Sequence, residues 1–132
     1  MATRHQVRQS VISLLYALEM NEKNDNFIDD YLNEKKIRNE QKKFTLNLYE
    51  GIFQNISNID EYLNSCLKEN EITKLGCIER AILRLGAYEL LFTDTPSAIV
   101  INEAIELAKE LANDNSPKFI NGVLDTLIKV KK

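Results

Sequence analysis

Two arginines and a histidine near the amino terminus are the residues whose types and spacing most clearly suggest a chemistry. Arg4 and Arg8 lie four residues apart with His5 between them, and residues 1–18 contain no acid although the chain carries a net charge of -3. Residues four apart in a helix project from one face, and each guanidinium offers a planar set of donors that suits phosphate. The pattern predicts a phosphate-binding face; the competing interpretation is a helix start with two exposed arginines.

A second candidate is the segment NSPKFINGVLD, Asn115 to Asp125, which places polar, basic and aromatic residues at a predicted helix start. The N-terminus of a helix presents N–H groups and a partial positive charge that favour phosphate, and Lys118 adds a cation. Phe119 lies at the edge of the apolar stripe. Two interpretations of Phe119 stay open: an aromatic that stacks on a base, or a residue at the boundary of the core.

A third basic stretch, KKIRNEQKK, runs from Lys35 to Lys43 with five cations and one acid, Glu40. Alone, such a run is more typical of a solvated connection than of a binding patch. It could add to a phosphate-binding face only if it folds beside the first helix, which the sequence does not determine.

The sequence gives no support for catalysis. The four glycines are isolated at positions 51, 76, 86 and 122, so no phosphate loop is present, and there is no nucleophile elbow or HExxH pair. Glu103 and Glu106 have ordinary helix-surface spacing. Cys66 and Cys77 are interpreted as two reduced thiols, and with His5 far away no metal-ligand set is visible. We therefore expect a protein that is not an enzyme and has no cofactor or metal.

Bulk properties indicate one globular unit. The chain of 132 residues is 44% hydrophobic and 28% charged, which is enough for a substantial core and ordinary for a folded protein. The start lacks the apolar core of a secretory signal, and no apolar run approaches the roughly 20 residues that span a bilayer. The expectation is a single cytoplasmic domain, residues 1–132, that does not contact a membrane.

The elements that position these residues are predicted to be helices, because apolar residues recur at steps of three and four nearly throughout. No alternating run suggests a strand, so the expected class is all-α with six to seven helices. Gly86, inside the buried fifth helix, predicts the close approach of another helix backbone. The predicted helices are, in order, one capped by Thr3, a short one around Phe27 to Leu32, one over Phe44 to Ile56, one starting at Ser57 or Asn58, a buried one over Cys77 to Phe92, one starting at Thr95-Pro96, and one starting at Ser116-Pro117.

Three segments together resemble the signature blocks of the NusB transcription antitermination family. They are CIERAILRLGAYELL (Cys77 to Leu91), PSAIVINEAIELAKE (Pro96 to Glu110) and PKFINGVLD (Pro117 to Asp125). Their order and separation also match, and VRQSVISLLYALE (Val7 to Glu19) is similar to the family's first helix. The resemblance spans essentially the whole chain.

The resemblance implies an all-α fold of two small packed bundles without catalytic activity. It implies binding to boxA-type RNA in nascent ribosomal RNA transcripts together with NusE, a small-subunit ribosomal protein, and action on the RNA polymerase antitermination complex so that terminators are read through. Carried over to this chain, the RNA-binding residues are Arg4, His5, Arg8, Ser116, Lys118, Phe119 and Asn121. The residues that face NusE are Glu79 and Tyr16.

One departure from the family pattern matters for function. Many relatives have a denser arginine cluster at the amino terminus, whereas His5 and Gln6 occupy neighbouring places here. We therefore expect weak RNA binding by the isolated protein, strengthened by NusE.

Two other classes of protein are alternatives to an antitermination factor. One is the NusB-like RNA-binding module of some ribosomal RNA cytosine methyltransferases, which needs a second, cofactor-binding domain. The other is a structural helical interaction protein with no RNA preference. The RNA sequence preferred and the choice between monomer and homodimer stay open.

Overall fold

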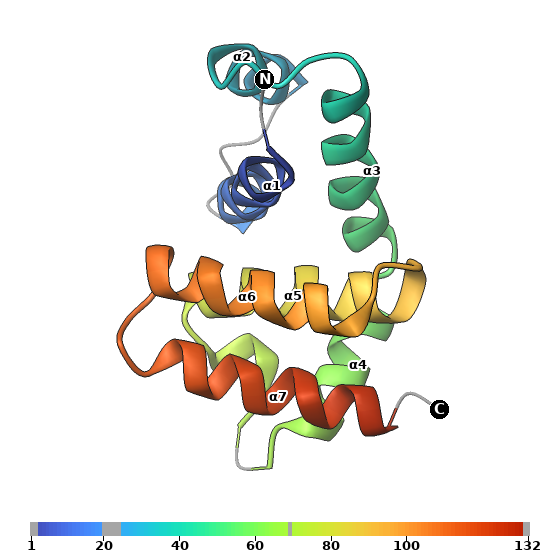
Figure 1. Cartoon of the computed structure of the whole chain (residues 1–132), viewed down its shortest axis with the longest axis vertical. Coiled ribbons are helices and arrows are strands. Elements are labelled where there is room, and N and C mark those ends of the chain that lie inside the picture. The colour runs from blue at the N-terminus through green and yellow to red at the C-terminus, as the bar shows by residue number, and fades with distance from the viewer. Residues whose placement is uncertain (1–2, 20–24, 69, 131–132) are drawn as a thin grey trace.

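The computed structural model describes residues 3–19, 25–68 and 70–130, and seven α-helices in these ranges confirm the all-α class (Figure 1). No strand occurs in the described residues, and none of their helices is long and apolar enough to cross a bilayer. The elements are α1 (Arg4–Glu19), α2 (Asp25–Glu34), α3 (Glu40–Gln54), α4 (Ile56–Cys66), a 3₁₀ helix (Ile72–Lys74), α5 (Cys77–Phe92), α6 (Ser97–Leu111) and α7 (Ser116–Val130). The expected polar break after the first helix falls mostly on residues 20–24, outside the described residues.

The start of α1 confirms the predicted cap at Thr3. The Thr3 hydroxyl accepts a hydrogen bond from the Gln6 backbone N–H at 3.1 Å, and the Gln6 side-chain oxygen accepts one from the Thr3 N–H at 2.8 Å. This reciprocal pair is a capping box, which satisfies two helix-start donors that have no partner within the helix.

The starts of α3 and α4 differ from the sequence expectation. α3 begins at Glu40, so the last part of the Lys35 to Lys43 run is helical and not a connection. α4 begins at Ile56, directly after Asn55, whose side-chain amide donates to the Gly51 carbonyl at 2.8 Å. The residue that ends α3 therefore also precedes α4, which leaves no loop for the later start that Ser57 or Asn58 suggested.

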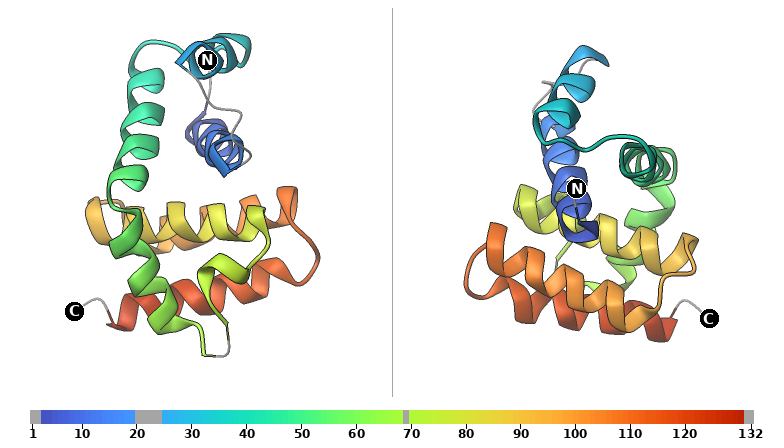
Figure 2. Two further views of the ribbon diagram at one scale, coloured as in Figure 1. Left: turned by 180° about the vertical axis from the view of Figure 1, so that it is seen from behind. Right: turned by 45° about the horizontal axis from the view of Figure 1, so that its top comes forward.

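The helices form two packed groups that share α5. α1, α2 and α3 lie on one side, and α4, α6 and α7 lie with α5 on the other (Figures 1 and 2). α5 contacts α1, α3, α4, α6 and α7, and its Ile82, Leu83 and Leu85 are fully buried. The prediction of a central buried helix is thus confirmed, and one continuous core runs through both groups.

A separate small core anchors the connection between α2 and α3. Leu32 and Ile37 are both buried, and Ile28, Tyr31 and Leu46 pack around them. Because Ile37 is the apolar residue in the middle of a basic run, its burial pins that run to the body of the protein.

Gly86 in α5 is close to another helix, as predicted, but the contact is a side chain and not a backbone. A Cβ built at Gly86 would lie 2.9 Å from Leu124 Cδ1 of α7 and 3.2 Å from Cδ2. Leu124 is fully buried, so it has little room to move away. The missing side chain at Gly86 thus makes space for Leu124.

We expect Gly86→Ala to lower the free energy of unfolding by about 1 kcal/mol or more, because overpacking of the core outweighs the gain in helix propensity. The control is Gly122→Ala in α7, where a Cβ meets no atom within 4 Å. That change should instead stabilise by up to about 1 kcal/mol. Urea denaturation measures both, and equal stabilisation by the two changes would contradict the packing argument.

Candidate nucleic-acid interface

Arg8, predicted to share an exposed face with Arg4, is instead buried at 5% exposure. Its Nε and Nη2 donate to the two carboxylate oxygens of Glu89 in α5 at 2.9 and 2.8 Å, and its Nη1 donates to Glu103 in α6 at 3.3 Å. The hydrogen bonds that Arg8 donates to Glu89 outweigh the cost of burial and raise the pKa of Arg8. The surface position expected for Arg8 is therefore wrong, because its donors already hold α1 against α5 and α6.

His5 bridges α1 and α6. Its Nδ1 lies 3.1 Å from Glu103 Oε1, and its Nε2 lies 2.7 Å from Glu110 Oε1. Burial alone would lower the pKa of His5, but the hydrogen bonds and charges of Glu110 and Glu103 raise it above the ordinary value of 6.5. The imidazolium form suits this position, because only that form donates from both nitrogens.

Arg4 keeps its charge on the surface. It is exposed, its guanidinium carbon lies 3.9 Å from the centroid of the Phe44 ring in α3, and it forms no ion pair with any described carboxylate. Stacking on an aromatic ring orients a guanidinium while leaving its donors available. Of the three predicted amino-terminal residues, Arg4 is thus the one placed to contact phosphate.

At the start of α7 the predicted residues divide between surface and core. Lys118 and Asn121 are exposed, whereas Phe119 is partly buried against the main core, as the boundary interpretation expects. Ser116 is fully buried, and its hydroxyl donates to Glu79 Oε2 of α5 at 2.5 Å. The structure therefore joins a predicted RNA-binding residue to a predicted partner-binding residue.

A further helix, α6, lies between the two stretches that are predicted to bind RNA. α6 lies between α1 and α7 in both views (Figures 1 and 2), and it carries the exposed Glu110 that binds His5.

Tyr16, one of the two residues predicted to face a protein partner, lines a small apolar hollow. Ile12, Ser13 and Tyr16 of α1 line it together with Ile78 and Leu111, and its volume is about 210 Å³. Tyr16 is 41% exposed and Leu111 is 40% exposed, and Glu79 follows Ile78 in the chain. The sequence pointed to Tyr16 and Glu79 but not to Leu111. The spacing of an apolar residue at a helix end does not show that it lies beside residues of another helix.

A second ion-pair cluster, which sequence reasoning missed, fixes the far end of α1. Arg80 donates to both oxygens of Glu19 at 2.6 Å, and Arg84 donates to Glu19 at 3.2 Å and to Asp60 at 2.9 and 2.8 Å. The hydrogen bonds from Arg80 lower the pKa of Glu19. The Cys77 thiol donates to the same carboxylate, and burial together with that carboxylate raises the thiol pKa. Cys77 is thus held as a protonated, weakly nucleophilic thiol.

These contacts define a class of protein. In the part of the chain that the structure describes, no three His, Cys, Asp or Glu side chains cluster as a metal site requires, and the buried charges serve to join helices. Three features face outward: the exposed Arg4 at the start of α1, the exposed Lys118 near the start of α7, and the apolar hollow lined by Tyr16. This is the organisation of a helical binding protein that has contact surfaces for more than one partner.

The chain belongs to the NusB family, whose profile matches residues 5–129. It is 80% identical over the full length of both chains to the transcription antitermination protein NusB of Campylobacter jejuni, and 64% identical to that of Campylobacter lari over 98% of each chain. Its structure is similar to Thermotoga maritima NusB, with a TM-score of 0.86 and 33% identity over 98% of this chain and 92% of that one. A chain from a crystal structure of NusB and NusE in complex with dsRNA matches with a TM-score of 0.84 and 28% identity over 96% of each chain. The resemblance seen in the sequence is confirmed.

We expect Arg8→Met to lower the free energy of unfolding by about 3–5 kcal/mol, because it leaves Glu89 buried and unpaired. Glu89 is 2% exposed. The double change Arg8→Met with Glu89→Met should recover most of this stability, since no charge then stays buried without a partner. Arg4→Met is the matched control and should change stability little. If Arg8→Met costs no more than Arg4→Met in urea denaturation, the buried pair is not what holds α1.

His5 is the single histidine of the chain, so its titration can be followed by NMR without assignment. We expect an imidazole pKa above 6.5 and a decrease in Glu110→Gln, which removes one acceptor. A pKa raised by folding contributes stability that is present below the unfolded pKa and is lost as the pH rises through the folded pKa. His5→Gln should therefore destabilise the protein more in acid than in alkaline buffer. A pKa that stays the same in Glu110→Gln would contradict the bridge.

Proposed function

We propose that this protein binds RNA together with NusE as a transcription antitermination factor, acting by binding and not by catalysis. The observation that supports this most directly is the shared fold, over 96% of both chains, with NusB in the complex of NusB and NusE with dsRNA. The curated relatives that match the full chain are antitermination proteins. By the family resemblance, the RNA is boxA of nascent ribosomal RNA transcripts, and the outcome is terminator read-through by RNA polymerase in the cytoplasm.

RNA contacts are assigned to the residues that the fold leaves on the surface. Arg4 offers a guanidinium oriented by Phe44, and Lys118 and Asn121 are exposed on the first turns of α7. Phe119 stacks on a base if it moves outward from its partly buried place. Both ring nitrogens of His5 contact glutamates, so its contribution to RNA binding is to keep α1 in place.

Two predicted RNA-binding residues act from inside the protein in this proposal. Arg8 holds α1 on α5 through Glu89, and Ser116 holds the start of α7 on α5 through Glu79. Both are positioning residues, because they set where Arg4 and Lys118 lie without reaching the surface themselves.

NusE is assigned to the hollow lined by Tyr16, Ile78 and Leu111. An apolar pocket with an exposed aromatic at its rim is typical of the centre of a protein interface. Glu79 follows Ile78, which lines this hollow, and it accepts the hydrogen bond from Ser116, two residues before Lys118. A partner that engages Glu79 thus acts on the carboxylate that positions the start of α7, which gives a physical route for cooperation with RNA.

We expect weak RNA binding by the isolated protein and at least about tenfold tighter binding with saturating NusE, which corresponds to about 1.4 kcal/mol of coupling. The reason is electrostatic: a net charge of -3 gives the isolated chain no general attraction to RNA. Linkage requires boxA RNA to tighten NusE binding by the same factor. Fluorescence anisotropy with boxA and scrambled RNA measures both.

The variants separate the two surfaces. Tyr16→Asp should remove the enhancement by NusE while leaving the weak intrinsic RNA binding. Glu79→Lys should do the same but also leaves Ser116 without its acceptor, so Glu79→Gln, which keeps an acceptor oxygen, is its control. Equal RNA affinity with and without NusE in the unaltered protein would refute the cooperative function, and enhancement that persists in Tyr16→Asp would refute only the assignment of the hollow.

A further inference from the structure

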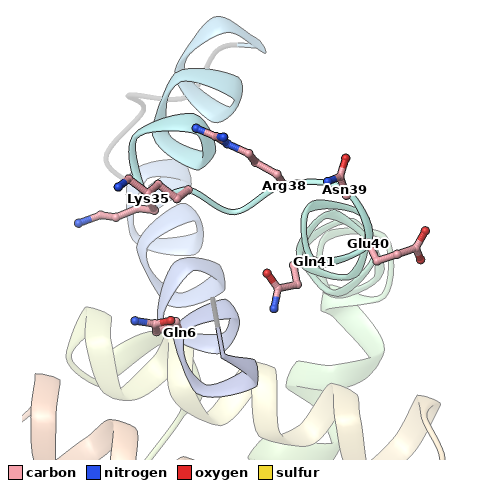
Figure 3. A pocket seen from close by; sticks show the side chains of 7 residues that line it. Gln6, Lys35, Arg38, Asn39, Glu40 and Gln41 are labelled. Atoms are coloured by element: carbon pink, nitrogen blue, oxygen red, sulfur yellow. The ribbon is translucent and has the colours of Figure 1, made fainter. Parts of the chain in front are cut away.

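The connection between α2 and α3 forms a basic groove beside α1. Lys35, Lys36 and Arg38 line a cavity of about 620 Å³ together with Gln6 of α1 and residues 39–41 at the start of α3. Figure 3 shows Gln6 on α1 and Gln41 on α3 on opposite sides of this space, with Lys35 on the connection above Gln6. The basic run thus lies beside the first helix, an arrangement that the sequence left open.

The groove has a fixed shape. The backbone N–H of Ile37 donates to the Leu32 carbonyl at 2.9 Å, and that of Lys36 donates to the Asn33 carbonyl at 3.0 Å. Ile37 itself is 1% exposed in the small second core. Lys36 and Asn39 have φ values of 59° and 57°, a left-handed conformation that non-glycine residues adopt rarely and at a cost. These backbone hydrogen bonds and the buried Ile37 hold the backbone that carries the cationic residues at a defined position.

The cations of the groove are not neutralised by the described residues. Lys42 pairs with Asp29 at 3.2 Å, but Lys35, Lys36 and Arg38 form no ion pair with a described carboxylate, and Lys35 instead lies 5.8 Å from the centroid of the Tyr31 ring. Glu40 is the one acid among the lining residues, and Figure 3 shows its side chain pointing away from Gln6 and Gln41. The residues that line the groove thus include three cations and one acid, in a chain that is acidic overall.

Ion pairs neutralise part of the positive charge on the face predicted to bind RNA, and the groove contributes further positive charge beside it. Arg8 and His5 both bind carboxylates, which leaves Arg4 as the unpaired cation of that stretch within the described residues. Gln6 lies two residues from Arg4 and lines the groove, and Arg4 stacks on Phe44, four residues after Glu40. The groove thus adjoins, through Gln6, the end of α1 that carries Arg4.

We propose that this groove binds the sugar–phosphate backbone of RNA, and that it extends the contact made by Arg4. The proposal rests on the proposed function, because it concerns the same RNA. The ligand class follows from the lining: cations on a fixed connection attract phosphates, and the Gln6 and Asn39 amides suit phosphate and sugar oxygens. The contact is therefore expected to add affinity uniformly and to carry no sequence preference.

The test compares two triple variants that carry the same net charge. The groove variant is Lys35→Gln, Lys36→Asn and Arg38→Gln, where Asn at position 36 tolerates the left-handed backbone. The control variant is Lys68→Gln, Lys74→Gln and Lys129→Gln. These three exposed lysines lie away from the groove: Lys68 follows α4, Lys74 ends the 3₁₀ helix and Lys129 is in α7. RNA affinity is measured by fluorescence anisotropy over a range of salt concentrations with saturating NusE, on boxA RNA and on scrambled RNA of equal length.

For the groove variant we expect weaker binding to both RNAs and a slope of log affinity against log salt that is shallower by about 0.7 for each phosphate that the variant no longer neutralises. The control variant should keep the slope of the unaltered protein. Equal slopes in the two variants overturn the groove and leave the proposed function standing. A groove variant that binds NusE less tightly in the absence of RNA also overturns it, since the surface would then serve the protein partner. If the unaltered protein binds no RNA even with NusE, the proposed function itself fails, and the groove proposal with it.

Discussion

The position of α1 across α5 depends on the buried pair of Arg8 and Glu89. Removing two charges from water costs several kcal/mol per ion, and the cost is recovered only when both partners meet in good geometry. The two hydrogen bonds between them therefore fix the register of α1, because a shift of one residue would leave both charges buried and unpaired. Glu19 and Arg80 fasten the other end of the helix. With both ends fixed, the surface that α1 can present is determined.

Periodicity predicted the helices well, because each one buries a stripe whose spacing is visible in the chain. The limits of Cys77 to Phe92 were correct, since the helix is followed by Thr93 in an extended conformation and preceded by Gly76. The burial of Arg8 could not be predicted from its own neighbours, because its partner is 81 residues away. A signal did exist in the partner: Glu89 is the one charged residue between Leu85 and Phe92 of α5, and a carboxylate buried among apolar residues is normally paired with a cation.

The candidate site was predictable in residue type but not in arrangement. Lys118 and Asn121 are on the surface as their polarity suggests, whereas Ser116 is polar and fully buried because Glu79 satisfies its hydroxyl. The basic connection shows the same limit. Its composition indicates a solvated segment, and only the single apolar residue Ile37 hints that it folds back on the protein. Two residues with positive φ, Lys36 and Asn39, then shape it without any glycine. Asn is a residue type that tolerates this conformation, but nothing about Lys36 predicts it.

Burial determines whether an arginine in this fold joins helices, as Arg8 does, or stays available to a ligand, as Arg4 does. Arg8 is surrounded by carboxylates in a low-dielectric site, so its charge is neutralised inside the protein and attracts nothing from solution. Arg4, on the same helix face one turn earlier, stacks on Phe44 and keeps its donors available. Because one surface arginine attracts RNA only weakly, an acidic chain of this kind needs further cations at the same place. The connection between α2 and α3 can provide them without disturbing α1, since its own small core around Leu32 fixes it independently.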